Sequence, residues 1–178
     1  MMTTMGGRQS SRMQSDVWLT PPAILSALGE FDLDPCAAPD PRPWPTATRH
    51  YALPQDGLSL PWEGRVWCNP PYSRQAVRWL RRLAEHGTGT ALIFARTETS
   101  WFIETVWEQA TAVFFLHGRV NFHYQDGSRA EWNGGAPSAL IAYGLRDAEL
   151  LRTCGLAGTY MSGWVTSASP AQLRLTAA

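Results

Sequence analysis

Short apolar runs alternate with amphipathic segments through most of the chain. Brief apolar or alternating runs predict β-strands at residues 31–34, 65–68, 91–95, 112–116 and 139–143. Segments whose apolar residues recur at helical spacing predict helices at residues 21–28, 74–86, 101–110 and 146–153. Because strands and helices alternate, the pattern predicts an α/β sheet that is largely parallel.

Cap and turn residues divide these elements. Thr20 and Ser73 stand where the N-caps of the first two helices are expected, since a hydroxyl can accept a hydrogen bond from a helical N–H. Five prolines between residues 35 and 45 exclude a helix or a central strand and predict a loop. Asp126-Gly127 separates two strand-like stretches, so residues 119–132 are expected to form a β-hairpin.

Length and composition fit a single globular domain. The chain has 178 residues, of which 44% are hydrophobic and 17% charged, a balance typical of a folded protein. Residues 1–15 are small and polar and lack the apolar stretch of a secretory signal, so we expect a mobile arm there. The domain is expected over residues 16–153, followed by an extension of uncertain structure at 154–178. No apolar run of about 18 residues occurs, so no membrane span is predicted.

Charge and metal-binding residue types narrow the functional classes. The formal net charge is zero, which argues against a protein that coats DNA by charge alone. The three cysteines show no CxxC spacing and the four histidines no metal-ligand spacing. We therefore expect a reduced, cytoplasmic protein without a bound metal.

Polar clusters follow three of the predicted strands. Asp34-Pro35 follows the first strand, residues 69–72 follow the second, and residues 96–99 follow the third. Ligands of open α/β sheets bind beyond the carboxyl ends of the strands, near the point where the strand order reverses. We therefore expect these clusters to meet at one site.

The tetrapeptide Asn69-Pro70-Pro71-Tyr72 predicts a specific chemistry at that site. Two prolines fix φ and keep the preceding residue extended, so the Asn69 side-chain oxygen and the Pro70 carbonyl can form a rigid pair of acceptors. A primary amine donates two hydrogens and matches such a pair, and Tyr72 offers a flat face for stacking a base. A base in a duplex has to flip out to reach this pocket. The alternative, a chance loop, is disfavoured because the string lies between an apolar strand and a helix.

The tetrapeptide by itself leaves the substrate open. Adenine N6 and cytosine N4 in DNA, and glutamine N5 in a protein, all present a suitable amine. Transfer of a methyl group from a sulfonium needs mainly positioning, and no arrangement for a covalent intermediate is evident. A non-catalytic DNA-binding module is the alternative from another functional class.

Several separated motifs together resemble the phage-type DNA N6-adenine methyltransferase (Dam-like) family. Residues 69–72 resemble motif IV of amino-methyltransferases. The other matching positions are Asp16, Trp18, Thr20, Pro21, Asp32, Asp34, Pro35, Ala37, Ala38, Asp56, Gly57, Leu58, Trp67, Cys68, Ser73, Thr97, Thr99, Trp101, Gly118, Arg119, Val120, Phe122, Pro137 and Ser138. The resemblance implies a single minimal Rossmann-like domain with an added hairpin, which uses S-adenosylmethionine to methylate adenine N6 in DNA.

The resemblance also implies roles for individual residues. The implied catalytic residues, which hold the target base, are Asn69, Pro70, Pro71 and Tyr72. The implied cofactor contacts are Thr20, Pro21, Asp34, Pro35, Ala37, Asp56 and Leu58. Phe122 is a candidate second stacking face. No glycine-rich loop follows the first predicted strand, so no residue is assigned to the cofactor's ribose.

Further DNA contacts are expected at two places. Arg119 stands at the mouth of the predicted hairpin, and Ser73 and Arg74 begin the helix after Tyr72. For the arginines of that helix as a group, an ordinary solvated face is the favoured interpretation, since the net charge is zero. A domain of this size is expected to act as a monomer or a homodimer in a bacterial cell, encoded by the bacterium, a phage or a prophage.

Overall fold

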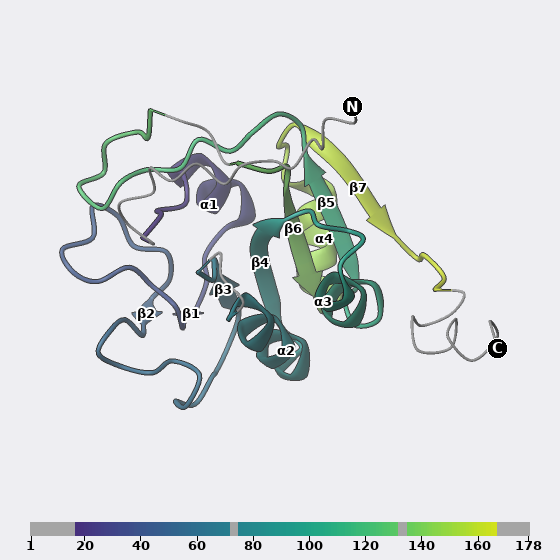
Figure 1. Cartoon of the computed structure of the whole chain (residues 1–178), viewed down its shortest axis with the longest axis horizontal. Coiled ribbons are helices and arrows are strands. Elements are labelled where there is room, and N and C mark those ends of the chain that lie inside the picture. The colour runs from purple at the N-terminus through teal and green to yellow at the C-terminus, as the bar shows by residue number, and fades with distance from the viewer. Residues whose placement is uncertain (1–16, 72–74, 132–134, 167–178) are drawn as a thin grey trace, which may run out of the picture.

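A seven-stranded sheet forms the centre of the fold, in the order β2-β1-β3-β4-β6-β5-β7 (Figure 1). The computed structural model describes residues 17–71, 75–131 and 135–166. The strands are β1 (Leu33–Asp34), β2 (Arg49–His50), β3 (Val66–Cys68), β4 (Gly89–Phe94), β5 (Ala112–Leu116), β6 (Ser138–Tyr143) and β7 (Gly158–Ser162). The predicted α/β class is confirmed, but the expectation of a largely parallel sheet is wrong, because three of the six strand pairings are antiparallel and the sheet is mixed.

The strand directions create a switch point at β1. β1 to β4 run parallel, β6 lies antiparallel between β4 and β5, and β7 pairs antiparallel with β5. β1 pairs with β2 on one side and with β3 on the other, so the chain reverses its direction of travel across the sheet there. The carboxyl ends of β1 and β3 therefore flank the kind of crevice in which α/β proteins bind ligands.

Helices cover both faces of the sheet. α1 (Pro22–Leu28) and α4 (Leu145–Thr153) pack on one face, whereas α2 (Ala76–His86), α3 (Ser100–Phe102) and the π-helix η1 (Ile103–Trp107) pack on the other (Figure 1). Side chains alternate along each strand, so Trp67 enters the core beneath α1 and Cys68 the core beneath α2. By the same alternation, the side chain after Cys68 is expected on the α1 face.

A buried ion pair ties β3 to α4 at the amino end of the strand. Arg65 Nε donates to Asp147 Oδ1 over 2.9 Å, and both side chains are at most 2% exposed. Arg65 Nη1 also donates to the carbonyls of Leu28 and Glu30, and its guanidinium lies 3.9 Å from the ring centre of Phe31. These contacts offset part of the cost of burying the charge, although Arg65 Nη2 and Asp147 Oδ2 find no hydrogen-bond partner among the described residues.

Some element boundaries differ from the sequence prediction. Thr20 is not the N-cap of α1, because Pro21 takes that position and no side chain caps the helix. The helix expected at 101–110 is a short α-helical turn followed by the π-helix η1. The predicted cap Ser73 lies outside the described residues.

The expected hairpin is reduced to a turn. Within the described part of residues 119–132, His123 and Arg129 form an isolated bridge, and Ala130 N–H donates to the Phe122 carbonyl over 2.9 Å. The turn is closed by Asp126, whose carboxylate accepts from the Ser128 N–H. The segment therefore reverses direction without building two strands.

Two features are absent from the described ranges 17–71, 75–131 and 135–166. No helix there has the length and apolar character needed to cross a membrane. No group of three or more His, Cys, Asp or Glu side chains gathers there as a metal site.

Candidate active site

Asn69 follows β3 directly and is anchored through its side chain. Its Nδ2 donates to the Trp18 carbonyl over 3.0 Å, which orients the carboxamide and directs Oδ1 to the opposite side of the group. Asn69 is half-buried, Pro70 is buried and Pro71 is exposed. Tyr72, Ser73 and Arg74 lie outside the described residues, so their expected roles stay predictions.

Residues 18–20, which anchor Asn69, are themselves fixed by hydrogen bonds at two positions. Leu19 exchanges backbone hydrogen bonds of 2.9 and 3.0 Å with His123, and the Thr20 carbonyl accepts from Trp44 Nε1 over 3.1 Å. The Thr20 side chain is 1% exposed, and its Oγ1 finds no hydrogen-bond partner among the described residues. Buried polar groups nearly always have a partner, so this hydroxyl marks a position where a ligand or water is expected to bind.

Asp34 ends β1 as a buried carboxyl group. Its Oδ2 accepts from Thr46 Oγ1 over 2.5 Å, and its Oδ1 accepts from the Cys36 N–H over 3.0 Å. Burial raises the pKa of Asp34 to about 6, although the hydrogen bonds from Thr46 and Cys36 act in the opposite direction. Asp34 is thus ionised at neutral pH in a place where a negative charge is poorly solvated, and a donor or a cation placed against it is favoured.

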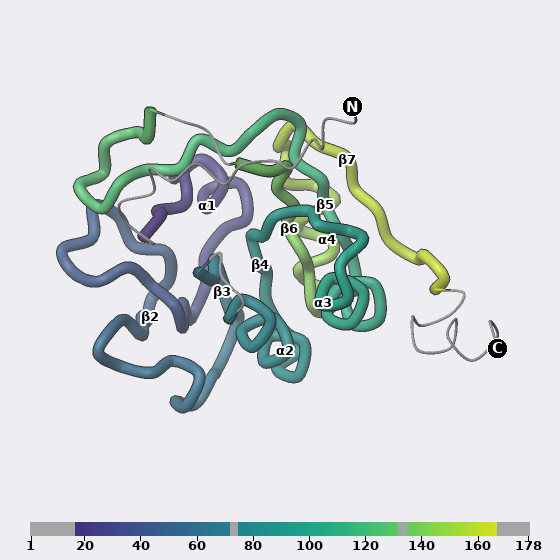
Figure 2. Tube along the Cα trace, in the orientation of Figure 1, coloured from purple at the N-terminus to yellow at the C-terminus, as the bar shows by residue number. Residues whose placement is uncertain are grey.

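Contacts between four segments close a ring around the switch point. Three of the links are the hydrogen bonds described above: Asn69 to Trp18, Trp44 to Thr20, and Thr46 to Asp34. The fourth is the contact between Cys36 Sγ and Cys68 Sγ, which lie 3.8 Å apart. The ring thus links residues 18–20, 34–36, 44–46 and 68–69. Figure 2 shows the blue proline-rich loop beside the green turn, in keeping with the 3.3 Å hydrogen bond from Gln125 Nε2 to the Pro39 carbonyl. The clusters expected after the first two strands therefore meet.

The loop of Asp56 and Leu58 also reaches this place. A Cβ atom on Gly57 would lie 1.9 Å from the Pro35 carbonyl oxygen, so the two backbones approach as closely as only glycine permits. The Asp56 carboxylate accepts from the Leu58 N–H over 3.0 Å and from Ser59 Oγ over 2.6 Å, and these bonds lower its pKa. Asp56 therefore closes its own turn, which rests against Pro35.

Gly57→Ala is expected to push this loop away from Pro35. Because the new methyl group meets backbone rather than a flexible side chain, we expect stability to fall by roughly 1–3 kcal/mol. Ligand affinity at the site should fall with it. Urea unfolding and calorimetric binding measure both effects. Gly135→Ala is the matched control, since a Cβ there meets no atom of the described residues within 4 Å. Equal effects of the two substitutions would contradict the close approach.

The other expected site residues lie in different surroundings. Ala37 is buried near the Asp34 loop, where its N–H donates to the Tyr51 carbonyl over 3.0 Å. Arg119 is exposed. Phe122 is 4% exposed within the core beneath α1, so a role in stacking on DNA stays a prediction.

Sequence reasoning missed Trp44 and Thr46, which bind the Thr20 and Asp34 segments. Both lie at the end of the proline-rich loop, where no periodic pattern indicates the direction of a side chain. Their contacts arise from the folded path of the loop. Trp18 was noticed as part of a motif, but its carbonyl acts through the backbone and carries no signal in the sequence.

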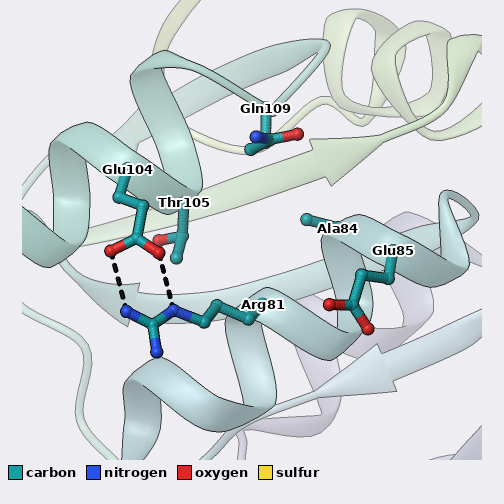
Figure 3. Close-up of a pocket in the computed structure, with 6 residues that line it drawn as sticks. All are labelled: Arg81, Ala84, Glu85, Glu104, Thr105 and Gln109. Carbon is teal, nitrogen blue, oxygen red and sulfur yellow. Dashed lines mark hydrogen bonds and ion pairs between the residues drawn. The ribbon is translucent and has the colours of Figure 1, made fainter. Parts of the chain in front are cut away.

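A separate hollow lies between α2 and η1. It has a volume of about 210 Å³ and is lined by Arg81, Ala84, Glu85, Glu104, Thr105 and Gln109. Figure 3 shows the two hydrogen bonds of 2.7 and 2.9 Å that join Arg81 to Glu104 across it. None of the residues of the switch-point ring lines this hollow.

Comparison with known families agrees with the motifs. A model of the family described as DNA N-6-adenine-methyltransferase (Dam) matches residues 8–148, most of the chain. The comparisons with curated proteins and with solved structures found no match. The resemblance seen in the sequence is confirmed. The chain belongs to the DNA N-6-adenine-methyltransferase (Dam) family, and methylation of adenine in DNA is the activity that this family carries.

Proposed function

We propose that the protein transfers a methyl group from S-adenosylmethionine to N6 of an adenine that has flipped out of duplex DNA. The observation that carries the proposal is the anchored Asn69, whose carboxamide is oriented by the Trp18 carbonyl at the carboxyl end of β3. A carboxamide fixed in this way presents its oxygen in one direction before the substrate arrives. Such preorganisation lowers the barrier more than a mobile group can.

Asn69 and Pro70 supply acceptors for the two hydrogens of the amine. Asn69 Oδ1 and the Pro70 carbonyl oxygen hold the amine and draw it toward tetrahedral geometry, which exposes the nitrogen lone pair. When bound, the cofactor would supply an electrophilic methyl group on its sulfonium sulfur. As the new N–C bond forms, the S–CH3 bond breaks and leaves a neutral thioether, and the amine gives up one of its protons to solvent. Tyr72 stacks on the base, a contact worth roughly 1–3 kcal/mol. No residue of the chain needs to form a covalent bond with the substrate.

The residues at the switch point fit a cofactor that carries a cation and hydroxyl groups. Thr20 Oγ1 is buried and has no partner in the described part of the chain, so a hydrogen bond from a ligand would satisfy it. The poorly solvated carboxylate of Asp34 favours a cation or hydroxyl donors, which S-adenosylmethionine carries on its methionine and ribose parts. The turn of Asp56 and Leu58 packs against Pro35 and forms a further side of the proposed cofactor site. Pro21 lies in the same segment as Thr20, and Ala37 lies in the same segment as Asp34.

The state of Asp34 makes a prediction about pH. Above about pH 6 the group is ionised in the free protein, and the ionised form is the one that accepts hydrogen bonds or pairs with a cation. Cofactor affinity is therefore expected to fall as the pH drops below about 6, approaching about tenfold per pH unit. Calorimetric titration with S-adenosylmethionine from pH 5 to pH 8 measures this.

Asp34→Asn provides the control for this prediction. The amide does not titrate, so its cofactor affinity should be low and independent of pH. A flat profile for the unmodified protein over the same range would remove Asp34 from the cofactor site.

The substrate class is tested with labelled cofactor. The protein is incubated with S-adenosylmethionine labelled in its methyl group, together with unmethylated DNA in one reaction and a mixture of cellular proteins in another. We expect label in DNA and none in protein. Label in protein alone would replace the proposal by glutamine methylation, and label in neither would leave a DNA-binding module without catalysis.

A further inference from the structure

Two aromatic rings lie together, and one of them belongs to the residue whose backbone anchors Asn69. The rings of Trp18 and Tyr124 have centroids 5.6 Å apart and planes inclined by 40°. Both residues are half-buried, and Trp18 also packs against the core beneath α1. Trp18 is the residue whose carbonyl orients Asn69. The Trp18–Tyr124 pair is thus linked to the predicted catalytic side chain through the backbone of Trp18.

The Trp18–Tyr124 pair rests on a rigid support. Leu19 and His123, the neighbours of the two aromatic residues, exchange both backbone hydrogen bonds. The ring of Trp44 meets that of His123 edge-on, with centroids 5.1 Å apart and planes inclined by 87°. Because the backbone next to both rings is fixed by these bonds, the two residues lose little freedom when a ligand stacks on them, which favours binding.

Charge alone gives this surface little attraction for DNA. Arg119 and Arg129 are exposed on the segment that carries Tyr124, but Asp126 and Glu131 are exposed on the same segment. Two cations are thus matched by two anions. Affinity for nucleic acid at this place has to come mainly from stacking, which depends on the aromatic faces and tolerates any base sequence.

We propose that the Trp18–Tyr124 pair is a stacking platform for a DNA base that flanks the target adenine. The inference rests on the proposed function, because it places DNA at Asn69. The Asn69 carboxamide and the platform are joined by one hydrogen bond, so a base on the platform also sets the position of its neighbour relative to Asn69. The platform adds a DNA contact that the tetrapeptide and its flanking helix do not provide.

The test measures DNA affinity by fluorescence anisotropy of a labelled duplex at several salt concentrations. Trp18→Leu and Tyr124→Leu are each expected to weaken binding by roughly 5- to 150-fold. The slope of log affinity against log salt should stay unchanged, because stacking releases no counterions. Trp18→Phe, which keeps a ring, should retain most of the affinity. A variant that merely lost its fold would also lose cofactor affinity and thermal stability, and both are measured alongside.

Trp164→Leu is the matched control. Trp164 is likewise half-buried, and its ring packs on that of Trp107 in the α2-side core. DNA affinity should survive this substitution. The inference is overturned if Trp18→Leu and Tyr124→Leu bind DNA as the unmodified protein does, if Trp164→Leu weakens binding equally, or if the salt slope changes instead.

The outcome is separable from that of the proposed function. Methyl transfer to DNA by the unmodified protein is measured in the same preparations. If the unmodified protein methylates DNA and the Trp18→Leu and Tyr124→Leu variants bind DNA normally, only the stacking platform is overturned. Failure of the unmodified protein to label DNA overturns the proposed function, and the binding comparison still decides the platform.

Discussion

Replacing Asn69 by alanine lowers the rate of methyl transfer by about 100- to 1000-fold, the loss expected when a preorganised polar group is removed from a reacting centre. The substitution removes one of the two acceptors for the amine and also the bond to the Trp18 carbonyl. The cofactor contacts proposed for Thr20 and Asp34 remain, so cofactor affinity should change little. Steady-state transfer rates and calorimetric binding of S-adenosylmethionine measure the two quantities.

Two further variants sharpen this prediction. Asn69→Asp keeps an acceptor but places a carboxylate oxygen against the Trp18 carbonyl, so we expect a loss of comparable size with an intact fold. Gln109→Ala removes a carboxamide from the hollow between α2 and η1 and should leave transfer unchanged. Loss of cofactor binding in a folded Asn69→Ala protein would show that Asn69 belongs to the cofactor site instead.

Removing Asp147 is expected to cause the largest loss of stability. Asp147→Ala leaves the buried guanidinium of Arg65 without its anion, and removing one partner of such a pair costs about 3–5 kcal/mol. Thr90 Oγ1, which donates to Asp147 Oδ1 over 2.7 Å, loses its acceptor as well. Unfolding in urea, followed by circular dichroism, measures the change in the free energy of unfolding.

The double variant Arg65→Met with Asp147→Leu tests the cause. With both charges gone and apolar side chains in their place, much of the lost stability should return. The exposed pair Arg81–Glu104 gives the contrast, because Glu104→Ala is expected to cost at most about 1 kcal/mol. A cost for Asp147→Ala as small as that would contradict the importance of the buried pair.

The central strands could be predicted because a buried strand requires a continuous run of apolar residues. β5 was predicted with its observed bounds, and β6 differs by one residue, since both are continuous apolar runs. β2 and β7 were not predicted. β2 has two residues and β7 is largely exposed, so each is defined by its pairing with a neighbour rather than by an apolar pattern.

Local rules failed where tertiary contacts decide the conformation. Thr20 has the residue type of an N-cap, yet its buried hydroxyl makes no capping hydrogen bond, and Pro21 takes the position. The Asp-Gly turn formed as expected, but the strands flanking it did not. Residues 17–20 pair with one side of that turn, and the proline-rich loop packs against its tip through Gly127 and Pro43.

The individual residues of the candidate site could be predicted from the sequence, but the hydrogen bonds that join them could not. Asn69 and Asp34 could be found because each follows a strand at the switch-point edge. The hydrogen bonds from Trp44 to Thr20 and from Thr46 to Asp34 join residues 12 or more positions apart through an irregular loop. Such contacts follow from the path of the whole chain, which no local pattern encodes.

The most direct test of the central claim identifies the methylated nucleoside. DNA that has been labelled by the protein with S-adenosylmethionine is digested to nucleosides and separated by chromatography with mass detection. We expect to find the methyl group in N6-methyladenine. Label in N4-methylcytosine instead would contradict it, because the same pair of acceptors at Asn69 and Pro70 would then serve a different base.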